Sequence, residues 1–210
     1  QIPGVDFEES LSPVINDVTW KILIILKLIY GLEAKLIDIE TAFQHGDLDV
    51  DIYMNTPKGL NFFMNIKDDE CVQLMKCTYG LVQSARQFKK KLYSTLKGWG
   101  VEEVKLDPCL LIKRTGKEKL FMGTHVDDIL AIGTTERINE LREYLEKQGL
   151  TTKLEPMEDY LGCKITFSKC GKKAWIGQPD IMKKIEEKFG DWVKDHKDVK
   201  TPGTQHKGVL

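Results

Sequence analysis

The apolar residues of this chain follow two spacings, which predict a mixture of helices and strands. Helical spacing predicts helices over about 18–30, 84–99 and 135–148, and a last helix that begins at Pro179. Asp17 is expected to cap the first helix and Gly31 to end it. Short apolar runs predict strands at 34–39, 71–74, 110–112 and 119–122, and in both halves of 121–132. Because helices and strands do not alternate regularly, the pattern predicts an α+β fold.

Two adjacent aspartates, Asp127 and Asp128, interrupt the apolar segment 121–132. An acidic pair between two buried strands is unfavourable unless a positive charge compensates it. Mg²⁺ prefers carboxylate oxygens and phosphates as ligands, so a turn that presents both side chains suits this ion. An ordinary hairpin is the alternative, since aspartate is common in turns.

A third aspartate, Asp38, lies at the end of the apolar run 34–39. If this strand lies beside the hairpin, Asp38 and Asp127 face each other across neighbouring strand ends. Such a pair can hold two cations that bridge the phosphates of a nucleotide. On its own, Asp38 is better explained as a strand-end or helix-capping residue, and only the nearby aspartate pair makes the cation site the better explanation.

The charge of the chain restricts how it can bind nucleic acid. The formal net charge of the 210 residues is −1, so any polyanion must be bound by a local patch. Residues 83–119 contain ten Lys or Arg against four acidic residues. This segment is either a solvated helix face or a phosphate-binding surface.

The cysteines and the apolar runs indicate a soluble intracellular protein. The five cysteines lack the close paired spacing of zinc sites and are expected to be reduced packing residues. The run Ile22–Leu26 is too short to span a bilayer, and we see no secretory signal at Gln1.

Four motifs, in order, resemble those of one known family. The segments are 38–43 with 46–48 and 52–59, then 79–88, then 125–128, and finally 160–165. Together they resemble the reverse transcriptase domain of polyproteins from Ty1/copia-type LTR retrotransposons. The resemblance runs from Gln1 to Pro202 and so covers nearly the whole chain.

The resemblance implies a right-hand polymerase palm with partial fingers and the start of a thumb. It assigns residues 1–34 and 56–100 to partial fingers and the fingers/palm helices, 35–55 and 101–167 to the palm, and 168–210 to the connection and the start of the thumb. It also implies an RNA-directed DNA polymerase that adds dNTPs to a primer on an RNA or DNA template. Its neighbours would be the integrase and RNase H regions of the parent polyprotein, in cytoplasmic virus-like particles without a membrane partner.

The same resemblance implies the residues of the site. Asp38 and Asp127, supported by Asp128 and the backbone carbonyl of Ile39, would bind two Mg²⁺ or Mn²⁺ ions. Phe43 would lie beneath the nucleotide sugar, Gly80 and Gln83 along the nucleotide and template, and Leu161 and Gly162 at the primer grip. Each of these residues also has a structural explanation: core packing for Phe43, a turn for Gly80, and a packed strand for Leu161 and Gly162.

The chain also departs from the family pattern. His125 stands where the family usually has Tyr, and Ala85 where Pro is common. The fingers strands that contact the triphosphate would precede Gln1, and the match of Lys153 to a lysine that protonates pyrophosphate is too loose to include it in the site. Two other interpretations stay open: a catalytically silent retroelement remnant that binds nucleic acid, and a palm-fold enzyme with another phosphoryl-transfer reaction.

Overall fold

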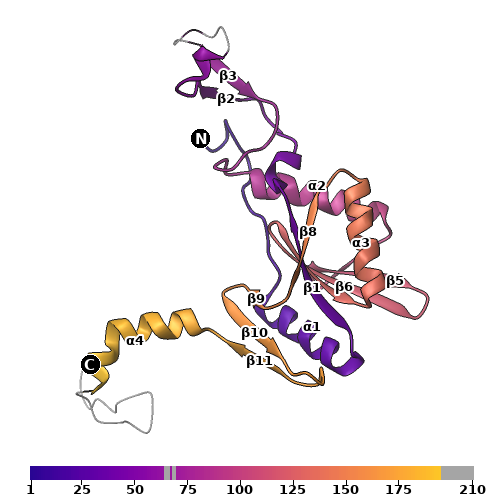
Figure 1. The fold of residues 1–210 in the computed structure, drawn as a ribbon. Helices are drawn as coiled ribbons and strands as arrows, with labels where there is room; N and C mark the ends of the chain where they lie inside the picture. The colour runs from indigo at the N-terminus through magenta and orange to yellow at the C-terminus, as the bar shows by residue number, and fades with distance from the viewer. Residues whose placement is uncertain (64–66, 68–69, 195–210) are drawn as a thin grey trace, which may run out of the picture. The chain divides into compact units, whose positions relative to one another are not determined.

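The computed structural model describes residues 1–63, 67 and 70–194 (Figure 1). The chain divides into two compact units, which are described separately. The first unit contains residues 1–157 and 168–173, and the second contains 158–167 and the chain from Ala174 onward. In the part of the chain that is described, no helix is long and apolar enough to cross a membrane.

The first unit is built on a sheet of six strands in the order β4-β5-β6-β7-β1-β8. The strands are β1 (Glu33–Ile39), β4 (Glu102–Val104), β5 (Asp107–Thr115), β6 (Glu118–His125), β7 (Asp128–Gly133) and β8 (Thr152–Pro156). All neighbouring pairs are antiparallel. The expected strands 110–112 and 119–122 are the central parts of β5 and β6. This large antiparallel sheet with helices confirms a mixed fold of the predicted kind.

One face of the sheet carries the main hydrophobic core. Two helices, α2 (Ser84–Gly98) and α3 (Thr135–Lys147), pack there against apolar residues of β1 and β7 (Figure 1). Ile37, Ile129 and Ala131 point to this face and are fully buried. Successive side chains of a strand alternate between faces, so Asp38 and Asp128 project to the opposite face.

The opposite face is partly covered by α1 (Asp17–Tyr30) and the segment that precedes it. Gly123 of β6 shows how closely they approach, because an added Cβ would lie 2.3 Å from Cδ1 of Ile15 and 3.6 Å from Cδ1 of Leu23. Gly123 pairs with Leu130, which pairs in turn with Leu36. The face that carries Asp38 and Asp128 is therefore apolar where α1 covers it. It is polar where β1 ends and β7 begins.

The helix boundaries follow the sequence pattern with one correction at a cap. Asn16, and not Asp17, caps α1: its side chain accepts a hydrogen bond from the backbone N–H of Val18 at 3.2 Å. Asp17 instead accepts the indole N–H of Trp20 at 3.0 Å and pairs with Lys21. Gly31 ends the helix in the left-handed conformation, as expected, with φ 62°.

A small hairpin completes the first unit. Strand β3 (Cys71–Leu74) has the predicted bounds, and its partner is β2 (Ile52–Asn55), which the apolar runs did not predict. Two short 3-10 helices, η1 (Ala42–His45) and η2 (Leu60–Phe62), lie in this part of the chain.

The second unit contains a three-stranded sheet and a helix. The sheet has the order β11-β10-β9, formed by β9 (Asp159–Tyr160), β10 (Cys163–Phe167) and β11 (Ala174–Gly177). Helix α4 (Pro179–Lys194) begins at the predicted proline, and Ile181, Ile185 and Phe189 on one of its faces are exposed. The assignment of palm, fingers and thumb regions stays a prediction.

Candidate active site

Four charged or titratable residues form a row across four strands of the large sheet. In the paired registers, His125 of β6 lies opposite Asp128 of β7, Asp128 opposite Asp38 of β1, and Asp38 opposite Lys153 of β8. Directly opposite residues of antiparallel strands have Cβ atoms about 4.5–5.5 Å apart on the same face. The sheet therefore brings Asp38 beside the hairpin, as expected, but its direct partner is Asp128 and not the expected Asp127, which lies in the turn.

The remaining aspartate, Asp127, lies in the turn between β6 and β7. Val126 and Asp127 are the two residues that join the paired His125 and Asp128. Val126 has φ 55°, which is a true outlier for a β-branched residue and costs about 1–2 kcal/mol. The turn that presents Asp127 is thus held in a strained backbone conformation, as happens at functional sites.

The electrostatics of the three aspartates show that they lie within reach of one another. Burial raises the pKa of Asp38, and the negative charges of Asp127 and then Glu155 raise it further. Burial also raises the pKa of Asp128, followed by the charges of Asp127 and Asp38, whereas His125 lowers it. Both carboxyl groups therefore lie where an additional negative charge is unfavourable and a cation would be favourable.

The fit of these residues to a metal ion rests on donor type and strand placement. Carboxylate oxygens are the ligands that Mg²⁺ and Mn²⁺ prefer. Among the described residues, no three His, Cys, Asp or Glu side chains converge closely enough to hold a metal ion. The ligand set of Asp38, Asp127, Asp128 and the carbonyl of Ile39 stays a prediction.

Phe43 contacts both the core and an aromatic ring that the sequence analysis did not select. Phe43 lies in η1, just beyond β1, and packs partly buried against the main core. Its ring centroid is 4.6 Å from that of Tyr79, with the two planes inclined by 49°. Tyr79 is 59% exposed, so this pair presents an aromatic surface to solvent. The sequence did hold a sign that Tyr79 belongs to the site, because this residue directly precedes Gly80 in the motif 79–88.

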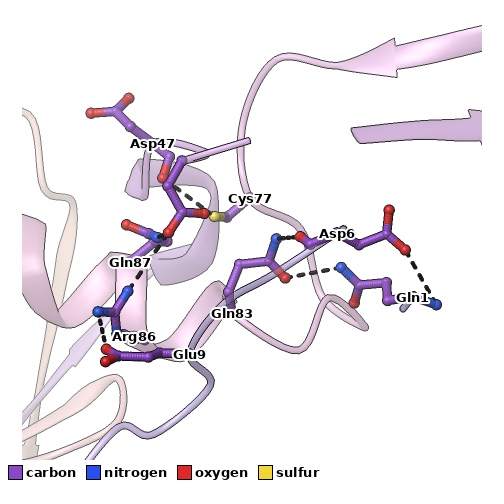
Figure 2. A network of polar contacts seen from close by, with 9 residues as sticks. Gln1, Asp6, Glu9, Asp47, Cys77, Gln83, Arg86 and Gln87 are labelled. Atoms are coloured by element: carbon purple, nitrogen blue, oxygen red, sulfur yellow. Dashed lines mark hydrogen bonds and ion pairs between the residues drawn. The ribbon is translucent and has the colours of Figure 1, made fainter. Parts of the chain in front are cut away.

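Gln83 is fully buried and its amide is occupied by the N-terminal segment. Its side chain donates to the backbone carbonyl of Asp6 at 3.0 Å and accepts from Nε2 of Gln1 at 2.9 Å (Figure 2). Gly80 has φ 101°, and nothing lies within 4 Å of where its Cβ would be. Gly80 is therefore required by its backbone conformation, and the contact of both residues with nucleotide or template stays a prediction.

The beginning of α2 is tied to two other segments by charged groups. Arg86 pairs with Glu9 of the N-terminal segment and lies 3.6 Å from Asp49 (Figure 2). Gln87 donates to the same Asp49. Much of the charge of Arg86 is thereby compensated within the protein.

Other basic residues of segment 83–119 are also engaged. The ammonium of Lys89 donates to the carbonyl of Pro13 at 2.9 Å. Further partners are Glu103 for Lys97, Glu102 for Arg114 and the carbonyl of Trp99 for Lys113. Lys90 and Lys91 are exposed. The segment is thus not a uniform basic surface, and its contact with phosphates stays a prediction.

Leu161 and Gly162 form the turn between β9 and β10 in the second unit. They lie between the paired residues Tyr160 and Cys163, with φ values of 50° and 74°. Positive φ at both positions of a two-residue loop is typical of tight hairpin turns. Their predicted contact with the primer is not tested by this geometry.

Comparisons with known proteins agree with the resemblance read from the motifs. The family model described as "Reverse transcriptase (RNA-dependent DNA polymerase)" matches residues 1–205. The chain is 33% identical over 208 residues to the retrovirus-related Pol polyprotein from transposon TNT 1-94 of Nicotiana tabacum, covering 98% of this chain and 15% of that protein. It is 32% identical over 133 residues to the retrovirus-related Pol polyprotein from transposon RE1 of Arabidopsis thaliana, covering 63% and 9%.

A third relative is the putative transposon Ty5-1 protein of Saccharomyces cerevisiae. It is 26% identical over 152 residues, covering 71% of this chain and 48% of that protein. The chain thus spans less than half the length of each of these three relatives. The chain belongs to the reverse transcriptase (RNA-dependent DNA polymerase) family, in the form found in Pol polyproteins of Ty1/copia-type transposons.

Proposed function

We propose that this chain is the DNA-synthesising part of a copia-type Pol polyprotein, which adds dNTPs to the 3′ end of a primer by two-metal phosphoryl transfer. The family match supports reverse transcription in general. The observation that carries the finer proposal is the pairing of Asp38 with Asp128, next to the turn that holds Asp127.

In this proposal the carboxylates bind the cations and fix their position. Asp38 and Asp127 would contact both ions, with Asp128 and the backbone carbonyl of Ile39 in support. Bound Mg²⁺ or Mn²⁺ would lower the pKa of the attacking 3′ hydroxyl and neutralise charge on the leaving pyrophosphate. The raised pKa values of Asp38 and Asp128 support a site that gains from cation binding.

The aromatic pair of Phe43 and Tyr79 would form the nucleotide subsite. Phe43 lies in η1, which follows β1 along the chain, and β1 carries Asp38 near its end. The exposed ring of Tyr79 would lie against the nucleotide, while Phe43 would leave too little room for a ribose 2′ hydroxyl. Gly80 would allow the backbone beside Tyr79 to approach the nucleotide.

The template and primer contacts are assigned to the remaining motif residues. Gln83 would act from its buried position, by holding the segment 79–82 in place. Leu161 and Gly162 would contact the primer near its 3′ end. We further propose that the integrase and RNase H regions of the same polyprotein are its partners, within cytoplasmic virus-like particles.

Primer extension tests the proposed function. The reaction would use an RNA template, a labelled DNA primer and dNTPs with Mg²⁺ or Mn²⁺, with this chain both alone and within its longer polyprotein. Extension should depend on the divalent cation and should be abolished in Asp127→Asn, whereas Asp180→Asn, an exposed acid of α4, should behave as the unmodified protein. Extension that survives in Asp127→Asn would refute the metal assignment. Failure of the longer protein to extend would favour the silent remnant.

A further inference from the structure

The strand β8 places a lysine directly beside the paired aspartates. Asp38 has Asp128 as its partner in one ladder and Lys153 as its partner in the other. Because opposite residues of antiparallel strands point to the same face, the Lys153 side chain projects beside Asp38. The charge of Lys153 lowers the pKa of Asp38, against the effects of burial and of the acidic neighbours.

A fourth acidic residue holds this lysine in place. Glu155 lies two residues after Lys153 on β8, so both side chains project from the same face. The ammonium of Lys153 pairs with the carboxylate of Glu155. The hydrogen bond to Glu155 and the charges of Glu155 and Asp38 raise the pKa of Lys153, so the ammonium form is favoured.

The influence of Glu155 extends beyond Lys153. Its negative charge raises the pKa of both Asp38 and Asp128. Asp38 therefore lies among the negative charges of Asp127 and Glu155, with the ammonium of Lys153 beside it. This arrangement goes beyond the four motifs, which contain neither Lys153 nor Glu155.

We propose that Lys153, held by Glu155, is the internal counter-cation of the carboxylate site and sets its affinity for divalent cations. Without a bound ion, the ammonium offsets part of the negative charge around Asp38. When an ion binds, the same ammonium opposes it, so Lys153 is a positioning residue that weakens cation binding. This inference rests on the proposed cation site, but it concerns residues that are not ligands in that proposal.

The expected effect is limited to about one order of magnitude because both side chains are accessible. The side chain of Lys153 is 63% exposed and that of Glu155 is 44% exposed, so water and salt screen their charges. A unit charge at roughly 6 Å from a divalent ion in a water-like medium changes the affinity for that ion about tenfold. The alternative is an ordinary ion pair on an edge strand, where lysine prevents strand-to-strand association.

Cation affinity distinguishes these explanations. Binding of Mn²⁺ would be measured from the paramagnetic resonance signal of the free ion at low ionic strength. Lys153→Met should bind Mn²⁺ about tenfold more tightly, and Glu155→Gln should bind it more weakly. Lys153→Arg should keep the unmodified affinity, because it retains the charge. Lys147→Met, an exposed lysine at the end of α3, is the matched control and should change nothing.

The outcomes separate this inference from the proposed function. If the unmodified chain binds Mn²⁺ and Asp38→Asn weakens binding, the site exists; unchanged affinity in Lys153→Met would then refute the inference alone. An equal gain in Lys147→Met would also refute it, since the effect would be general surface charge. If the unmodified chain binds no Mn²⁺, both the site and the role of Lys153 are refuted. Unfolding without cations gives a second readout, in which Lys153→Met should be less stable than Lys147→Met.

Discussion

Asp38 of β1 lies directly opposite Asp128 of β7 in an antiparallel ladder, although the motif 79–88 and several strands lie between them in the sequence. The pairing arises because β1 lies between β7 and β8 in the sheet. Like charges directly opposite each other destabilise a sheet, so the arrangement has a cost in the absence of a cation. A residue pair that weakens the fold is expected where it serves a site.

Neutral substitutions should reveal this cost. At pH 7 without divalent cations, Asp38→Asn and Asp128→Asn should each raise the free energy of unfolding by about 0.2–1 kcal/mol, because each removes the repulsion between opposed carboxylates. Urea denaturation in the presence of a chelator measures this change. Glu143→Gln, at an exposed carboxylate inside α3, is the control and should be nearly neutral. Loss of stability in both aspartate variants would show that these carboxylates are structural groups.

Asp107 is expected to make the fold sensitive to acid. It is buried, and burial raises its pKa, but hydrogen bonds from Thr19 and from the backbone N–H groups of Asn16 and Cys109, at 3.0 and 2.9 Å, lower the pKa overall. A carboxyl whose folded pKa is below its unfolded value stabilises the protein above the unfolded pKa. This contribution is lost as the pH falls through the folded pKa.

The corresponding variant is Asp107→Asn. It should lower the free energy of unfolding at pH 7 by about 1–3 kcal/mol, because buried backbone donors lose a charged acceptor. Urea denaturation between pH 3 and 7 should show that the difference from the unmodified protein shrinks towards pH 3. Asp51→Asn, at an exposed carboxylate, is the control. A difference that stays constant with pH would contradict the role of the Asp107 charge.

The sequence pattern correctly predicted the elements that depend on interactions between residues close together in the chain. Helical spacing located α2 and α3, the apolar run located β3, and Gly31 marked the end of α1. The predicted cap of α1 was wrong because Asn16 and Asp17 are both residue types that cap helices. The choice between them is coupled to Asp107, which accepts the N–H of Asn16 from far along the chain.

Pairings between distant segments were beyond the reach of the sequence pattern. Strand β2 was missed because Ile52 is its only buried residue, so it has no alternating apolar pattern. The burial of Gln83 depends on contacts with Gln1 and Asp6, which lie 82 and 77 residues away. For the site, residue types and motif order predicted the meeting of Asp38 with the hairpin. They did not predict the row that includes Lys153, because strand order fixes that row.

The aromatic pair gives a prediction for nucleotide binding. Tyr79→Ala should weaken dNTP binding about 2–10-fold, since an aromatic contact is worth about 0.5–1.5 kcal/mol. Tyr79→Phe keeps the ring against Phe43 and should keep the affinity. The KM for dNTP in primer extension measures the effect. Equal KM values in the alanine and phenylalanine variants would contradict a nucleotide subsite at Tyr79.

The strain at Val126 separates stability from activity. Val126→Gly should raise the free energy of unfolding by about 0.5–1 kcal/mol, because glycine avoids the left-handed penalty of about 1–2 kcal/mol but loses more backbone entropy on folding. Denaturant unfolding measures this gain. The same variant should extend primers more slowly, because the turn no longer holds Asp127 in one conformation.

A matched variant tests whether the effect belongs to strain. Val18 of α1 is exposed and lies in an ordinary helix, so Val18→Gly should lower stability by about 0.5–1 kcal/mol and leave extension unchanged. A stabilised Val126→Gly with full activity would mean that the strain has no function at this turn. A destabilised Val126→Gly would mean that the Val126 side chain contributes packing that outweighs the backbone penalty.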